Sequence, residues 1–272
     1  MRIGIGTTLP HTTPVEWVNT LASMGCTAAV SPFDCATARP LRDEYLAQAR
    51  DHDLTIGEVG VWRNVMSPDP GERHRSIQYA KDQLALAEEI GARCCVNISG
   101  NAGPGGWDQY SPENYDEATY ARIVETTQDI IDAVDPTHTT YAIECMPWMV
   151  PDSPHGYLQL MKDIDRPAFS VHLDYTNMIN GMARWRALPE FIAQCFELLA
   201  THVVSVHIKD IRLQPGLPTA ITEVQPGTGA VDFDMVLRHI AALPEGTTVY
   251  VEHLPDQQAY REAMAFVLRK AQ

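Results

Sequence analysis

Apolar segments alternate with amphipathic segments along the whole chain. The apolar segments follow the period of two that is typical of β-strands, and the segments between them repeat at the spacing of an α-helix. Strands are predicted at residues 2–7, 28–31, 55–61, 93–98, 140–145, 169–174, 203–209 and 248–253. Helices are predicted at residues 15–24, 41–52, 72–90, 114–134, 156–164, 188–200, 232–243 and 257–271.

Eight strands joined by helices predict one α/β domain, a (β/α)8 TIM barrel over residues 1–272. An open, doubly wound sheet is the competing architecture. It is disfavoured because no G-x-G-x-x-G motif follows the first strand and because the candidate chemistry is spread over several strands. Two longer connections, 100–112 and 211–229, are expected to be loops on the C-terminal face of the barrel.

Charge and hydropathy exclude some classes of partner. The formal net charge of −15 disfavours nucleic acid and anionic membrane surfaces. No apolar run approaches the roughly 20 residues of a membrane helix, and residues 1–6 begin a strand-like alternation instead of a signal peptide. We therefore expect a cytoplasmic protein, in which the six cysteines, none in a C-x-x-C pair, are reduced thiols.

Ionisable residues fall at the ends of the last four predicted strands. Side chains alternate between the two faces of a strand, so setting Val204 outward turns His207 toward the barrel axis. The same reasoning turns Glu144, Asp174 and Glu252 inward. Such a group is costly unless a cation or protons offset the charge. Three carboxylates and an imidazole predict one divalent metal ion, Mn2+ as first choice, with Mg2+, Co2+, Zn2+ or Fe2+ as alternatives.

Each of these residues also has an ordinary explanation when it is taken alone. Glu144 and Glu252 can be solvated or ion-paired. His207 can be a hydrogen-bonded core histidine, and Asp174 can cap the following turn. Four unrelated explanations seldom coincide on consecutive strand ends, so the set favours a metal site more strongly than any member does.

Two further residues are candidates for substrate binding. Lys209 is predicted to point inward, where it either holds a substrate oxyanion or pairs with Asp210. His172 either contacts substrate hydroxyls or orients Asp174.

Three tryptophans, Trp62, Trp107 and Trp148, fall on predicted loops of the C-terminal face. Their aromatic faces suit the C–H faces of a sugar, and ordinary loop packing is the alternative. The segment 227–229, G-x-G, resembles a phosphate-binding loop only superficially. It neither follows a strand directly nor opens a helix tightly, so we interpret it as a conformational turn.

Several motifs at these strand ends resemble the xylose isomerase-like barrel superfamily. This superfamily includes sugar phosphate isomerases/epimerases, tagatose/allulose 3-epimerases, inosose dehydratase and endonuclease IV. The resemblance covers nearly the whole chain and is carried by Ile143-Glu144, His172-Leu173-Asp174-x-x-Asn177, Val206-His207-Ile208-Lys209-Asp210, Pro226-Gly227-x-Gly229-x-Val231-Asp232 and Val251-Glu252.

The resemblance implies that one Mn2+-class ion is held by four residues, Glu144, Asp174, His207 and Glu252. It also implies that Glu144 and Glu252 flank opposite faces of the substrate and exchange its proton. The ketohexose epimerases place a substrate-binding histidine three residues after the ligand aspartate. This chain has Asn177 there, a candidate substrate contact that argues against C3-epimerisation of a hexose. Endonuclease IV-like activity is disfavoured, because the third and fourth strands end without the additional histidines of a trinuclear zinc cluster.

The main functional hypothesis is a metal-dependent isomerase or epimerase of a keto-sugar or related polyol. The ion would stabilise an enediolate while Glu144 and Glu252 act as acid and base. A lyase is the alternative, either an inosose-type dehydratase or a 3-oxo-glycoside or C-glycoside deglycosidase, because the segment 144–148 is unlike that of common epimerases. A non-catalytic sugar-binding barrel is the third. Each hypothesis has a small sugar or polyol as partner and leaves a homo-oligomer or partner subunit open.

Overall fold

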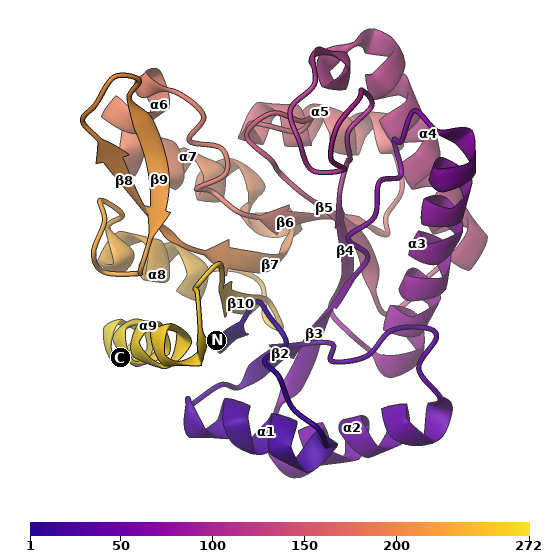
Figure 1. Cartoon of the computed structure of the whole chain (residues 1–272), viewed down its shortest axis with the longest axis vertical. Coiled ribbons are helices and arrows are strands. Elements are labelled where there is room, and N and C mark those ends of the chain that lie inside the picture. Colours follow the sequence, from indigo (N-terminus) through magenta and orange to yellow (C-terminus); the bar gives the residue numbers. More distant parts are fainter.

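Eight parallel strands form the centre of the molecule in a computed structural model that describes residues 1–272 (Figure 1). Their order is β1-β10-β7-β6-β5-β4-β3-β2. Across the seam between β1 and β2, Thr27 N donates a hydrogen bond of 2.7 Å to Ile3 O, so the barrel is nearly closed. The strands are β1 (Arg2–Ile5), β2 (Ala28–Val30), β3 (Thr55–Gly60), β4 (Cys94–Ile98), β5 (Thr140–Glu144), β6 (Phe169–Leu173), β7 (Val203–Ile208) and β10 (Thr248–Val251).

Helices connect consecutive strands and cover the outside of the barrel, as the alternating pattern predicts. Several begin at a side chain that accepts a hydrogen bond from the first turn, such as Asp69, Ser153 and Asp232. The helices are α1 (Pro14–Ser23), α2 (Arg39–Asp51), α3 (Pro70–Ile90), α4 (Glu117–Val134), α5 (Pro154–Ile164), α6 (Met182–Arg186), α7 (Leu188–Leu199), α8 (Phe233–Ala241) and α9 (Gln257–Lys270), with the short 3-10 helices η1 (Pro112–Tyr115) and η2 (Ala200–His202). None of them combines the length and the apolar character of a membrane span.

The hydrophobic core has two parts. A cluster of 58 buried residues fills the space between strands and helices. A smaller cluster brings Val204 of β7 against Cys94, Val96 and Ala142 of β4 and β5, across the inside of the barrel. The expectation that Val204 points outward is therefore wrong. The register between β6 and β7 shifts at His172, and this irregularity lets Val204 turn inward.

The connection after β7 also differs from the expected loop. It contains an antiparallel hairpin formed by β8 (Asp210–Gln214) and β9 (Ala220–Val224), which projects beside α6 and α8 in Figure 1. The first of these strands alternates polar and apolar residues, D-I-R-L-Q, and the segment between the two strands, 215–219, is P-G-L-P-T. That pattern is typical of a hairpin, so the signal was present in the sequence.

Candidate active site

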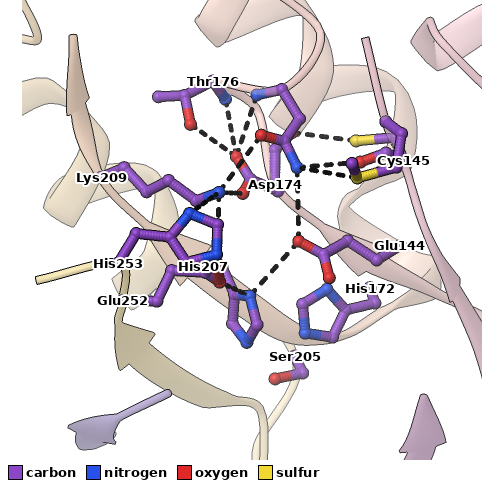
Figure 2. Close-up of polar contacts among 12 residues, drawn as sticks. Glu144, Cys145, His172, Asp174, Thr176, Ser205, His207, Lys209, Glu252 and His253 are labelled. Carbon is purple, nitrogen blue, oxygen red and sulfur yellow. Dashed lines mark hydrogen bonds and ion pairs between the residues drawn. The ribbon is translucent and has the colours of Figure 1, made fainter. Parts of the chain in front are cut away.

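Four ionisable side chains from neighbouring strands converge at the C-terminal end of the barrel. Glu144 ends β5 and His207 lies on β7, whereas Asp174 and Glu252 directly follow β6 and β10. One potential ligand atom from each residue lies within 4.8 Å of those from the other three. The structure thus brings together all four residues that strand alternation turned toward the axis (Figure 2).

The turn after β6 fixes the carboxylate of Asp174. Its Oδ1 accepts hydrogen bonds from Thr176 N at 3.0 Å, Thr176 Oγ1 at 2.6 Å and Asn177 N at 3.0 Å. Its Oδ2 is buried and accepts no hydrogen bond of good geometry, although Lys209 Nζ lies 2.8 Å away. Asp174 therefore caps a turn with one oxygen and presents the other to the cluster.

Lys209 places a buried ammonium group among these carboxylates. Its side chain is 2% exposed, and Nζ lies 2.8 Å from Asp174 Oδ2 and 3.2 Å from Glu252 Oε1. It also donates a hydrogen bond of 3.2 Å to Asn177 Oδ1. Burial favours the neutral amine, but the facing carboxylates outweigh it and hold the pKa of Lys209 well above its ordinary value. Lys209 does not pair with Asp210, which was one of the two roles considered for it.

His207 lies between two sets of carboxylates. Its Nδ1 contacts Glu252 Oε2 and lies 3.4 Å from Glu144 Oε1, while its Nε2 lies 3.4 Å from Glu58 Oε2. Burial acts to lower the pKa of His207, but the three glutamates outweigh it and raise that pKa well above the ordinary value. The imidazole thus connects the four-residue cluster with a deeper carboxylate, Glu58.

Glu58 is a buried site residue that sequence reasoning missed. It lies on β3 two residues before the strand ends, is 1% exposed, and contacts His207, Ser205 Oγ and His172 Nε2, the last at 2.8 Å. Burial acts to raise the pKa of Glu58, but His172 and His207 hold it well below the ordinary value. The sequence did contain a signal for Glu58, a carboxylate near the end of a predicted strand, and the same signal identified Glu144.

His172 lies below the cluster instead of lining the cavity above it. Its side chain is fully buried, and its Nε2 is engaged by Glu58, not by Asp174. Neither of the roles considered for His172 agrees with this geometry. The side chain instead supports Glu58 and packs edge-on against the ring of His207, with the ring centroids 4.1 Å apart.

We expect Glu58→Gln to destabilise the fold. The change removes a buried negative charge that faces two imidazoles, so the free energy of unfolding should fall by about 3 kcal/mol. Urea unfolding, with the exposed Glu44→Gln on α2 as the control, measures the effect. A loss no larger than about 0.5 kcal/mol, the usual range for a surface change, would contradict the assignment.

The cluster opens into a cavity of about 470 Å³, hereafter the site cavity. Glu144, His207, Glu252 and Asn177 line it from the strand ends. Its walls include three tryptophans from loops, Trp62, Trp107 and Trp148. The structure therefore places Trp62, Trp148 and Asn177, each expected to contact substrate, at one cavity whose volume suits a small molecule.

Asn177 is also tied to the cluster from the side of β5. Its Nδ2 donates to Cys145 O at 3.0 Å and lies 3.4 Å from Glu144 Oε1. Since its Oδ1 accepts from Lys209, the amide links the two sides of the site.

Two further residues of the site, His253 and Glu223, were not anticipated. His253 Nε2 lies 2.6 Å from Glu252 Oε1, and its Nδ1 lies 2.8 Å from Glu223 Oε2. These two carboxylates raise the pKa of His253 to about 10, against a smaller effect of burial. Glu223 belongs to the hairpin strand β9, so the unrecognised hairpin explains why its contact with the site was missed.

The loop at 227–229 is a structural turn, as expected. The carboxylate of Asp210 accepts hydrogen bonds from the backbone N–H groups of Gly227 at 2.9 Å, Gly229 at 2.7 Å and Val231 at 3.1 Å. These donors would be the ones available to a phosphate, and a side chain of the protein already uses them. The loop therefore anchors the hairpin to the end of β7.

The four-residue cluster fits a divalent cation. Ligands of such an ion lie at 2.0–2.6 Å from it, so any two of them are at most about 5 Å apart, as the four residues are here. Three buried atoms among them, Asp174 Oδ2, His207 Nδ1 and Glu252 Oε2, have no hydrogen bond of good geometry within the protein, although each lies in an ion pair with Lys209 or with one another. Carboxylate oxygens with one imidazole suit Mg2+- or Mn2+-class ions. These groups can hold a metal.

Solved structures of similar fold include sugar epimerases and a dehydratase. The D-psicose 3-epimerase of Clostridium cellulolyticum H10, crystallised with D-tagatose, aligns over 100% of this chain and 99% of its own, with a TM-score of 0.71 and 13% identity. The probable 3-DHS dehydratase of petrobactin synthesis from Bacillus anthracis aligns over 95% and 94%, with a TM-score of 0.71 and 14% identity. At these identities the likeness shows the fold alone.

A xylose isomerase-like TIM barrel protein from Mycobacterium smegmatis, crystallised in complex with magnesium, aligns over 94% of this chain and 87% of its own, with a TM-score of 0.68 and 13% identity. No curated protein matches the sequence. A family model, the xylose isomerase-like TIM barrel, matches residues 18–270. The chain belongs to the family of xylose isomerase-like TIM barrels.

Proposed function

We propose that the protein is a divalent-metal-dependent sugar isomerase or epimerase that acts on a keto-sugar or related polyol. The reaction is proton transfer next to a carbonyl group through an enediolate of the substrate. The observation that carries the proposal is the position of Glu144 and Glu252. Both carboxylates line the site cavity from different strands, and both contact the imidazole of His207.

Glu144 and Glu252 are proposed as the two proton carriers. One removes the carbon-bound proton of the substrate, and the other returns a proton. A substrate held between them can therefore be isomerised, or the configuration at the reacting carbon can be inverted. Asn177, Lys209 and the tryptophans Trp62 and Trp148 are proposed to hold the sugar, because they line or adjoin the same cavity.

Glu144, Asp174, His207 and Glu252 are proposed to hold the ion, with Mn2+ as the first choice because of the imidazole. A bound divalent ion supplies Lewis-acid stabilisation of the negative charge that develops on a substrate oxygen. Lys209, whose Nζ lies 3.2 Å from Glu252 Oε1, would contribute a second positive charge beside the ion. A related barrel crystallised with magnesium supports an ion of this class.

Proton NMR of candidate substrates in D2O with added Mn2+ tests the proposal. Keto-sugars, inososes and 3-oxo-glycosides are incubated with the protein, and deuterium uptake next to the carbonyl group is expected without loss of any substituent. Uptake must be absent when the protein is omitted. If no member of the panel exchanges a proton with solvent, the isomerase or epimerase proposal is wrong.

A lyase is the second candidate, and the surroundings of Glu252 favour it specifically. Elimination needs an acid beside the leaving group, and protonated His253 and Lys209 both contact the carboxylate of Glu252. The likeness to a dehydratase fold agrees with this candidate. In the same NMR experiment, release of water or of an aglycone identifies a lyase.

A further inference from the structure

A second cavity adjoins the site cavity. It has a volume of about 490 Å³ and lies among the loops that follow β1, β2 and β3, so we name it the β1–β3 cavity. Gly6 and Trp62 line both cavities, which makes the two spaces neighbours. The polar residues that line it include Thr7, Thr8, Ser31, Asp34, Thr37 and Tyr79.

Trp62 forms the wall between the two cavities and is held in an unusual conformation. Its φ of 49° lies in the left-handed region, which a bulky residue seldom adopts. The indole packs over Gly60, where a Cβ atom would come within 2.1 Å of Trp62 Nε1. The residue nevertheless remains 37% exposed. Backbone strain of this kind is found at ligand clamps, and an exposed indole face is a surface on which a sugar ring stacks.

The lining of the β1–β3 cavity indicates the chemistry of its occupant. No lysine, arginine or histidine is among its lining residues, which include the carboxylates of Asp34 and Glu58. The guanidinium of Arg63 lies outside the lining, over the ring of Tyr79, so the lining disfavours a phosphate or carboxylate group. The hydroxyl of Tyr79 has one long contact, 3.4 Å to Asp34 Oδ2, and both groups border the cavity. Hydroxyl and carboxylate groups beside an aromatic wall suit an uncharged, hydroxyl-rich ring.

We propose that the β1–β3 cavity binds a second, uncharged sugar ring that is linked to the reacting ring. The substrate class is then a glycosylated keto-sugar, with the reacting ring over Glu144 and Glu252 and the second ring beyond Trp62. This inference rests on the proposed function for the place of the reacting ring. It adds a binding site that the reaction itself does not require.

A third cavity, of about 480 Å³, lies on the opposite side of the site, beyond Trp148. It shares Trp148, Asn177 and Glu223 with the site cavity. Its other lining residues include Ile179, Met182, Ile211 and Ile221, which suit an apolar group better than a sugar ring. It provides the comparison for the experiment.

Binding of matched ketoses to the Mn2+-loaded protein tests the inference. The probes are D-fructose and its α-D-glucosyl derivatives at O3, O4 and O6, which are turanose, maltulose and isomaltulose. Isothermal titration calorimetry should give at least one disaccharide a Kd roughly tenfold lower than that of D-fructose. Thr8→Trp, which fills the β1–β3 cavity, should cancel this difference and leave D-fructose binding unchanged.

Thr219→Trp is the matched control, since Thr219 is also exposed and lines the third cavity. Tyr79→Phe is a milder second variant, and loss of one ligand hydrogen bond should weaken disaccharide binding about fivefold. Thermal melting curves verify that each variant is folded. The inference is overturned if no disaccharide binds more tightly than D-fructose, or if only Thr219→Trp removes the preference.

Deuterium uptake separates this inference from the proposed function. If the preferred disaccharide binds through the β1–β3 cavity but exchanges no proton, the second-ring site stands and the reaction is wrong. If D-fructose exchanges a proton and Thr8→Trp changes the Kd of none of the ketoses, the proposed reaction stands and the second-ring site is wrong.

Discussion

Replacing Glu252 by glutamine is expected to lower the rate of solvent deuterium uptake into the substrate by about 10²- to 10⁴-fold. Glutamine has nearly the same shape and can still contact His253 Nε2, but it cannot accept and return a proton. Glu144→Gln is expected to have an effect of the same size, because proton return needs a second carrier. The measurement is single-turnover NMR in D2O at saturating Mn2+.

Two controls make this result specific. Glu44→Gln on the exposed surface of α2 should leave the rate unchanged. Circular dichroism and Mn2+ titration of Glu144→Gln and Glu252→Gln should show that each variant folds and still binds the ion at the concentration used. Full activity in both variants would rule out the mechanism with two carboxylates.

Removing the metal is expected to abolish deuterium uptake, and adding Mn2+ or Mg2+ is expected to restore it. Without an ion, the carboxylates of Glu144, Asp174 and Glu252 have only the side chains of Lys209, His207 and His253 to offset their charge. A bound ion should therefore also stabilise the fold, by about 2.7 kcal/mol at a concentration one hundred times its Kd. Activity after EDTA treatment and thermal melting with and without Mn2+ measure the two effects.

Asp174→Asn is the matched variant for the metal experiment. Asparagine keeps an oxygen that can accept the hydrogen bonds of Thr176 and Asn177, but it lacks the negative charge of Oδ2. We expect it to fold and to lose most of the stabilisation by Mn2+. Unchanged turnover after exhaustive chelation of the wild-type protein would contradict the role of the ion.

Local pattern was sufficient to predict the barrel and the convergence of four side chains. The alternation of strands and helices predicts a parallel sheet, and eight such units close it. Side chains along a strand alternate between its two faces, so the position of a residue in the strand predicts which face it occupies. This alternation places His207 and Glu252 toward the axis. Glu144 and Asp174 follow from the same rule, because the C-terminal ends of neighbouring parallel strands lie together.

The partners of these residues were decided only by the tertiary structure. Glu58 meets His172 and His207 across 114 and 149 residues of chain, respectively. Alternation gives the face of a residue but not its neighbour across the barrel, which depends on the relative shift of the strands. The register shift at β6 and β7, which turns Val204 inward, follows from packing over the whole chain. The position of the hairpin, which brings Glu223 to His253, follows from the same packing. Cavities beside Trp62 arise in the same way, because they are the space left once every loop is in place.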